Sequence, residues 1–401
     1  MIYLDNNATT AIDTRVAKVL TNALSHGPLN ASSQHRFGQR AQGRLAAALD
    51  EIAECLGSDL TTVGSDRLVV TSGGTEANNA AILGIGEPDS TLIVSSIEHP
   101  SVLAAAQSFI AESGQNDGHN DGLGRPVSFI DVDRQGVIRL DCLRKVIDEA
   151  KRNGRPAGLV SIMSANNETG VIQPIQAAAE VCREAGVPLH VDATQSIGKM
   201  PVHFHDWGID AATFTPHKYH GPVGVGFLWL RSGVEIRSHL FGGEQQLGAR
   251  PGTEPVPLVI AAAEATRLAV EEQAEAAAKM SRLRDQFEKI LLAQEFPIEI
   301  HGANVNRLPS TSCVSFLGTD RQEMLVGLDM SGVACSSGSA CSSGSSPPSH
   351  VLMAMRASKA AIDSALRFGV SKFSTEQEIA RAAELVSRKI KGRSGSPRVE
   401  N

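Results

Sequence analysis

Residues 68–79 read Leu68-Val69-Val70-Thr71-Ser72-Gly73-Gly74-Thr75-Glu76-Ala77-Asn78-Asn79. A short apolar run is followed here by two glycines and several hydroxyl residues, which open an Ala-rich helical stretch. Apolar strands that alternate with helices are typical of a mostly parallel sheet covered by helices on both faces, an α/β fold. Six further apolar runs follow, at residues 92–94, 127–130, 159–162, 189–191, 212–214 and 226–230. Together with the run at 68–70 they predict a seven-stranded sheet.

Chain length predicts two domains. The 401 residues exceed the ~250–300 at which a single hydrophobic core usually stops growing. Pro255 precedes a long Ala/Glu/Leu/Arg stretch at about residues 258–292, whose apolar spacing predicts one long helix linking the domains. We expect a strand at 312–316 and helices at 322–329 and 376–390 in the second part. The predicted domains are a large one over 16–254 and a smaller α+β one formed by 1–15 and 255–401.

Composition favours an enzyme or binding protein for small ligands. The chain has 37 basic and 44 acidic residues and a net charge of −7, so it lacks the basic footprint of a direct nucleic-acid or membrane-surface binder. No apolar run approaches the ~20 residues of a membrane span, and residues 1–5 lack the pattern of a secretory signal. The six cysteines are scattered singly, which predicts reduced thiols, no metal site and a cytoplasmic protein.

The turn at Gly73-Gly74-Thr75 is a candidate phosphate site. Free N–H groups and the dipole at a helix start attract an anion, and glycines let it approach the backbone. The alternative is an ordinary strand-to-helix turn with Thr75 as the helix cap. Ligands of parallel sheets bind at the carboxyl ends of the strands, so the residues after the other runs decide between the two.

Two charged residues stand at such strand ends. Asp192 follows the run 189–191, and Lys218 follows the run 212–214 inside a Gly/Pro-rich loop. An isolated lysine there is often an ordinary surface cation. A lysine that binds pyridoxal 5'-phosphate (PLP) covalently needs a carboxylate for the pyridine nitrogen and a phosphate site. Asp192, Lys218 and the Gly74-Thr75 turn supply all three.

The chain resembles the cysteine desulfurases of the NifS/IscS type, in the class V aminotransferase branch of the fold-type I PLP-dependent transferases. Each matching motif is weak alone, but their order and spacing together are specific. They run nearly end to end: 3–10 (YLDNNATT), 71–76 (TSGGTE), 98–102 (EHPSV), 166–170 (NNETG), 190–195 (HVDATQ), 217–218 (HK), 250–254 (RPGTE) and 336–344 (SSGSACSSG).

The resemblance implies PLP as the cofactor, L-cysteine as the substrate and a homodimer as the assembly. It places PLP on Lys218, the pyridine nitrogen on Asp192 and the ring face against His99, for which a buried structural imidazole is the alternative. Arg367 is expected to hold the substrate carboxylate through its planar bidentate fork, the alternative being a surface ion pair. The other implied contacts are Gln195 with the ring hydroxyl, Asn167 beside the ring and substrate, Gly74, Thr75, Thr215 and His217 at the phosphate, and Thr253 of a second subunit at the same phosphate.

Cys341 is expected to be the catalytic nucleophile. Its thiolate takes sulfur from substrate cysteine as a persulfide, and the Ser/Gly-rich loop 335–349 without an apolar face is suited to carry it outward. A Cys335–Cys341 disulfide or metal pair is the structural alternative. The long loop resembles the branch that supplies an iron–sulfur scaffold or another sulfur acceptor. Irregular structure is also predicted for residues 113–124, and a disordered tail after about 391.

Departures from the family pattern concern Leu247, where many relatives carry arginine, and Pro216, which restricts Thr215 to an extended conformation. The resulting prediction is an enzyme that converts L-cysteine into L-alanine and a Cys341 persulfide, for iron–sulfur cluster assembly or tRNA and cofactor thiolation. The alternatives are selenocysteine lyase, another class V lyase on the same scaffold, and a non-catalytic assembly partner that kept the fold.

Overall fold

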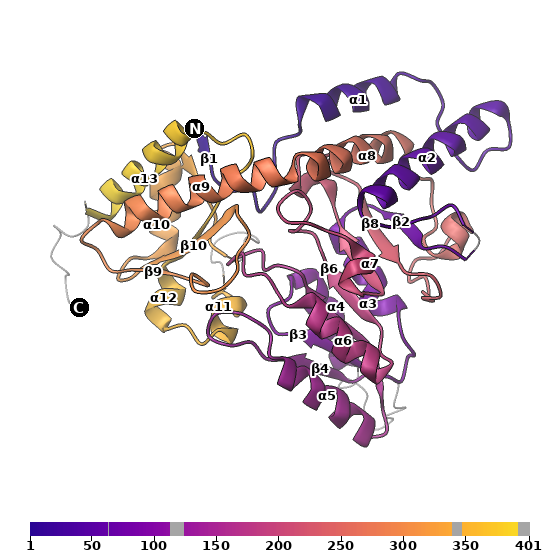
Figure 1. Ribbon diagram of the computed structural model, residues 1–401, viewed down its shortest axis with the longest axis horizontal. Coiled ribbons are helices and arrows are strands. Elements are labelled where there is room, and N and C mark those ends of the chain that lie inside the picture. Colours follow the sequence, from indigo (N-terminus) through magenta and orange to yellow (C-terminus); the bar gives the residue numbers. More distant parts are fainter. Residues whose placement is uncertain (63, 113–123, 339–346, 392–401) are drawn as a thin grey trace.

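The computed structural model describes residues 1–62, 64–112, 124–338 and 347–391, and it confirms the predicted seven-stranded sheet (Figure 1). Its strands are β2 (Arg67–Thr71), β3 (Thr91–Ser95), β4 (Val127–Ile130), β5 (Ala157–Met163), β6 (Leu189–Asp192), β7 (Ala211–Phe214) and β8 (Gly226–Leu230). They lie in the order β2-β8-β7-β6-β5-β3-β4. Strand β8 is antiparallel to both its neighbours, whereas the pairs from β7 to β4 are parallel.

Helices cover both faces of this sheet because successive strand residues point to opposite sides. Leu68 and Val70 pack into one core with α2, α5, α6 and α8, whereas Val69 packs into a second core with α3 and α4. The helices of this part are α1 (Thr14–Leu24), α2 (Arg36–Cys55), α3 (Gly74–Gly84), α4 (Pro100–Glu112), α5 (Leu140–Arg152), α6 (Ile175–Ala185), α7 (Phe204–Trp207) and α8 (Val256–Glu271).

A smaller α+β part has its own core, which buries Leu4, Phe287, Phe316 and Phe368. The predicted strand at 312–316 is confirmed as β10 (Thr311–Phe316). The predicted helices at 322–329 and 376–390 are confirmed as α10 (Arg321–Met330) and α13 (Glu376–Lys391). Strands β12 (Ala365–Gly369), β10 (Thr311–Phe316) and β9 (Ile298–Ile300) form one sheet, and β1 (Ile2–Tyr3) pairs with β11 (Val333–Ala334). The helices are α9 (Gln273–Leu292), α10 (Arg321–Met330), α11 (His350–Ala354), α12 (Lys359–Ser364) and α13 (Glu376–Lys391).

The prediction of one unbroken helix over 258–292 is wrong. Helices α8 and α9 lie nearly end to end (Figure 1), but Glu272 interrupts them with φ −91° and ψ 0°. The Glu272 carboxylate is held there by Arg15 at 2.5 Å and Lys372 at 2.7 Å. Helix α8 packs in the large core and α9 in the small one, so the chain passes between the two cores at this break. The division into domains at residue 255 stays a prediction.

Several predicted segments fall outside the described residues: most of the loop 113–124, the centre of the loop 335–349 with Cys341, and the tail from 392. Of the helices that the structure does describe, none has the length and apolar character required to cross a membrane.

Candidate active site

A cavity of about 710 Å³ lies where the carboxyl ends of β6 and β7 meet the start of α3. Parallel strands deliver the residues that follow them to the same edge of a sheet, which explains why motifs far apart in sequence converge there. Ten of the residues singled out from the sequence line this cavity: Gly74, Thr75, His99, Asn167, Asp192, Gln195, Thr215, His217, Lys218 and Arg367.

Lys218 ends the short 3-10 helix η1 (Pro216–Lys218), which follows β7. Its Nζ donates to the backbone carbonyls of Asn7 at 2.8 Å and Ala8 at 2.6 Å. Burial, assisted by the positive charge of Arg367, lowers the pKa of Lys218 to about 8. A substantial fraction of this amine is therefore neutral near pH 7.5, as a nucleophilic lysine requires.

Asp192 is buried at the end of β6. Its Oδ1 accepts from the backbone N–H of Thr194 at 3.0 Å, and its Oδ2 accepts from Nδ2 of Asn78 at 2.8 Å. Asn78 lies one turn into α3, and its Nδ2 also donates to Oγ of Ser101 at 2.9 Å. The Asn78 amide therefore links the carboxylate to the segment that holds His99.

The hydrogen bonds of His99 assign its tautomer. The backbone N–H of Ser101 donates to Nδ1 at 3.1 Å, and Oγ of Ser101 lies 2.7 Å from the same nitrogen. A nitrogen that accepts a backbone N–H carries no proton, so the neutral ring has its proton on Nε2. Burial lowers the pKa of His99. The negative charge of Asp192 opposes this shift, and the positive charges of Lys218 and Arg367 reinforce it. The residue is a neutral imidazole that offers an N–H donor.

The first turn of α3 contributes Gly74 and Thr75 to the cavity wall. Gly73 is the N-cap and makes no side-chain cap bond, so Thr75 is not the cap of this helix. The first N–H groups of an α-helix have no intrahelical acceptor, and together with the helix dipole they favour an anion. A Cβ on Gly74 would lie 3.4 Å from the Thr215 side chain, an ordinary van der Waals contact, so Gly74 and Thr215 are close neighbours.

Two more predicted phosphate residues line the same end of the cavity. Thr215 adopts the extended conformation expected before Pro216, with φ −147° and ψ 131°, and its hydroxyl donates to the carbonyl of Val225 at 2.9 Å. Nδ1 of His217 lies 3.1 Å from Oγ1 of Thr9. Burial, together with the nearby lysines, lowers the pKa of His217 to about 4, so this ring is neutral at pH 7.

Arg367 lies on β12 and is only 3% exposed, so it is not a surface ion pair. Its Nη2 pairs with Asp5 at 2.8 Å, and its Nη1 donates to the carbonyl of Asn167 at 3.1 Å. Among the described residues no acceptor lies within hydrogen-bond reach of its buried Nε. The guanidinium is thus fixed in orientation, and the second hydrogen of each Nη is left to donate to a substrate carboxylate.

A comparison with known families identifies the family of this chain. The model of aminotransferase class V matches residues 2–382. The chain belongs to the class V aminotransferase family. It is 37% identical to the cysteine desulfurase of Trichormus azollae over 96% of this chain and 92% of that protein. It is 33% identical to the cysteine desulfurase IscS of Dictyoglomus turgidum over 97% of this chain and 94% of that protein.

Solved structures place this class V family member in the same group. A NifS-like protein from Rickettsia africae superposes with a TM-score of 0.84 at 29% identity, and the match covers 98% of this chain and 99% of that one. The fold prediction is thereby confirmed, and the chain is an enzyme of the NifS/IscS-like cysteine desulfurase group. Members of this family are PLP-dependent.

Cys341, the predicted nucleophile of this class V enzyme, lies outside the described residues, but both flanks of its segment are described. Gly338 and Pro347 line the cavity. Oγ of Ser349 donates to Oε2 of Glu168 at 2.5 Å, and a Cβ on Gly338 would lie 2.1 Å from that same oxygen. One carboxylate therefore contacts the chain on both sides of the segment that carries Cys341.

Two predicted or singled-out residues lie away from the cavity. Thr253 is exposed and is not part of the cavity wall of its own chain. It follows Arg250, which pairs with Glu76 at the start of α3 at 2.7 Å. Leu247 is 86% exposed with φ 57°, so within one chain its side chain contacts no residue of the site.

Sequence reasoning gave no individual role to five residues that shape the site. Asp5 and Asn7 orient Arg367 and Lys218, and Asn78 and Ser101 orient Asp192 and His99. Glu98 is fully buried beside His99, and burial raises its pKa to about 8. Four of them lie inside the quoted motifs and Asn78 lies two residues after the motif 71–76, so the only available signal was their position near a predicted site residue.

Proposed function

We propose that this class V enzyme is a PLP-dependent cysteine desulfurase that converts L-cysteine to L-alanine and leaves the sulfur as a persulfide on Cys341. The observation that carries the proposal is the convergence of a buried Lys218 amine, the Asp192 carboxylate and both flanks of the Cys341 segment on one cavity. The similarity to proteins named cysteine desulfurase supports the same reaction.

The residues of the cavity fit PLP. Lys218 has a lowered pKa suited to covalent attachment, Asp192 is a buried carboxylate for the pyridine nitrogen, and α3 begins with free N–H groups for the phosphate. His99 would lie on the ring face. When bound, PLP withdraws electrons from the substrate Cα and weakens the bonds around it. The remaining expected contacts are Asn167 beside the ring, Gln195 at the ring hydroxyl, and Thr75, Thr215 and His217 near the phosphate.

The other steps of the reaction depend on amino-acid side chains of the protein. Arg367 holds the substrate carboxylate through the donors that Asp5 and Asn167 leave free. The neutral His99 can donate the proton on its Nε2 at the face of the site, and Lys218 can accept or donate a proton through Nζ. The Cys341 thiolate attacks the substrate sulfur: a sulfur–sulfur bond forms, the carbon–sulfur bond breaks, and the carbon keeps the electron pair until it is protonated.

We also propose a homodimer in which Thr253 of one subunit completes the phosphate site of the other. The segment between β8 and α8 supports this arrangement because Phe241 is 100% exposed and Leu247 86% exposed. Exposed large apolar side chains favour a protein partner, and a second copy is the partner proposed. Arg250 pairs with Glu76 in the first turn of α3 and so holds the same segment close to the helix start that lines the cavity. An iron–sulfur scaffold or another sulfur acceptor, in the cytoplasm, then receives the persulfide.

The test uses two variants and one control, each supplied with L-cysteine and reductant. Lys218→Ala should lose the borohydride-reducible link between PLP and protein. Cys341→Ser should retain PLP but lose alanine and sulfide release by orders of magnitude, because a hydroxyl is hardly ionised near neutral pH. Cys335→Ser is the control and should keep most activity.

The outcomes separate this function from its alternatives. Release of alanine from cysteine that does not depend on Cys341 would indicate a selenocysteine lyase or another class V lyase. A purified protein without bound PLP or turnover would indicate a non-catalytic assembly partner.

A further inference from the structure

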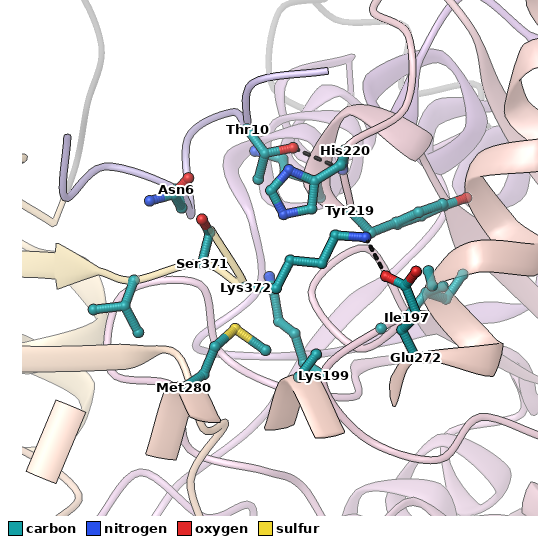
Figure 2. Close-up of a pocket in the computed structure, with 15 residues that line it drawn as sticks. Asn6, Thr10, Ile197, Lys199, Tyr219, His220, Glu272, Met280, Ser371 and Lys372 are labelled. Atoms are coloured by element: carbon teal, nitrogen blue, oxygen red, sulfur yellow. Dashed lines mark hydrogen bonds and ion pairs between the residues drawn. The ribbon is translucent and has the colours of Figure 1, made fainter. Parts of the chain in front are cut away.

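A second, small cavity of about 30 Å³ lies at the junction of the two cores, and Lys199, Glu272 and Lys372 are among the residues that line it (Figure 2). Its volume is enough for one water molecule. Lys199 rises into it from the segment that follows β6, and Glu272 and Lys372 form an ion pair on its wall. Lys218 also lines this cavity, whereas Lys199 has no role in the reaction described so far.

Lys199 is a buried amine with a single side-chain partner. It is 7% exposed, and its Nζ donates to Oε1 of Gln195 at 2.7 Å. Among the described residues no other acceptor lies within hydrogen-bond distance of this Nζ, although an ammonium group has three donors. Burial, reinforced by the positive charges of Lys218 and Arg367, lowers the pKa of Lys199 to about 7. Burial of a charged amine is costly unless the group is paired and hydrogen-bonded.

The bond from Lys199 fixes which way the Gln195 amide points. In its ammonium form, which predominates below a pKa of about 7, Lys199 can only donate, so it then requires the carbonyl oxygen of Gln195 to face it. Nε2 of Gln195 must then face the active site, where it donates to the carbonyl of Asn7 at 3.0 Å. The same carbonyl accepts from Nζ of Lys218 at 2.8 Å. A continuous set of hydrogen bonds thus runs from the small cavity to the reactive lysine.

We propose that Lys199 is a positioning residue, which holds the Gln195 amide so that its N–H group, and not its oxygen, faces the bound PLP. The inference rests on the proposed function, since it assumes PLP on Lys218. An N–H donor at that position stabilises an oxygen anion on the ring, whereas a flipped amide would place one oxygen against another. Lys199 therefore acts through Gln195 and touches neither PLP nor substrate.

Other charged and titratable groups surround Lys199 and must be held constant in any test. Lys218 and Arg367 face it from the active site, and both lower its pKa. Glu272, Lys372 and His220 face it across the small cavity. Lys372 provides a matched control because it lines the same cavity but pairs with Glu272 at 2.7 Å and Asp13 at 3.3 Å rather than with Gln195.

The experiment follows the visible absorbance of PLP bound to the full-length protein as a function of pH. Lys199→Met should raise the midpoint of this titration by about one pH unit, corresponding to a tenfold change in the protonation equilibrium. Lys372→Met should leave the midpoint unchanged. A wild-type midpoint in Lys199→Met overturns the inference. Absence of PLP absorbance in the wild-type protein would instead defeat the proposed function, so the two failures are distinguishable.

A double-mutant cycle tests whether Lys199 acts through Gln195. In the Gln195→Met background, Lys199→Met should shift the midpoint no further, because the amide that it positions is gone. An equal shift in both backgrounds would mean a direct effect of the Lys199 charge and would overturn the inference. Should Lys199→Met not fold, Lys199→Gln is judged by the same cycle and the same two criteria.

Discussion

The lowered pKa of Lys218 predicts how fast the protein without cofactor captures PLP at different pH values. Only the neutral amine attacks the PLP aldehyde. A lysine with its ordinary pKa of 10.5 is about 0.1% neutral at about pH 7.5, whereas a pKa of about 8 makes about a quarter of the amine neutral. For equal intrinsic reactivity, the structure therefore predicts capture on the order of 200-fold faster than by a free lysine side chain.

The assay mixes cofactor-free protein with excess PLP and follows the visible absorbance of the covalent link over a pH series. N-acetyl-lysine supplies the reference amine with an ordinary pKa. The rate should rise with pH through a midpoint of about 8 and level off above about pH 9, where about nine tenths of the amine is neutral. Arg367→Met should move this midpoint upward, because the positive charge of Arg367 is the second cause of the lowered pKa after burial.

A rate that continues to rise to about pH 10 in the wild-type protein, parallel to N-acetyl-lysine, would refute the reasoning. It would mean that the Lys218 amine is solvated when PLP arrives. A midpoint near 8 that does not move in Arg367→Met would refute only the contribution of the arginine and leave burial as the whole cause.

Three further outcomes are expected. Thr253→Ala should lose PLP several-fold faster on dialysis while remaining dimeric, and unchanged retention would contradict a shared phosphate site. Cys335→Ser should keep most desulfurase activity, because burial raises the pKa of this thiol to about 12; loss of turnover would assign Cys335 a chemical role. Gly338→Ala places a Cβ 2.1 Å from Oε2 of Glu168. Cysteine turnover should therefore fall about tenfold or more while PLP occupancy stays unchanged. Wild-type turnover in this variant would show that the chain at Gly338 adjusts freely.

Most of the site could be predicted from the residues that follow the apolar strands. Apolar runs fixed the positions of the strands, and parallel pairing then required Asp192 and Lys218 to meet at one edge of the sheet near Gly74. The antiparallel direction of β8 could not be derived in this way, because a buried strand has the same apolar pattern in either direction.

Residues held by long-range contacts could not be assigned from the sequence. Asp5 reaches Arg367 only because the N-terminal segment crosses to the small part, where β1 pairs with β11. Lys199 looks like a surface cation, since nothing in the sequence reveals that its amine is buried against Gln195. The break at Glu272 was equally hidden, because both sides of it have helical spacing and the turn follows from tertiary ion pairs.

The position of β8 in the chain delays completion of the sheet edge at β2 during synthesis. Thr71 at the end of β2 pairs with Gly226, and the outer edge of β2 is capped by the Gln246 amide, which bonds Val70 at 2.6 and 3.0 Å. At roughly 5–20 residues per second, a ribosome needs roughly 8 to 30 s to translate from β2 to β8. During that time β2 has no partner on either edge, a state that favours aggregation. Chains truncated before residue 226 should therefore fail to bind PLP and should aggregate.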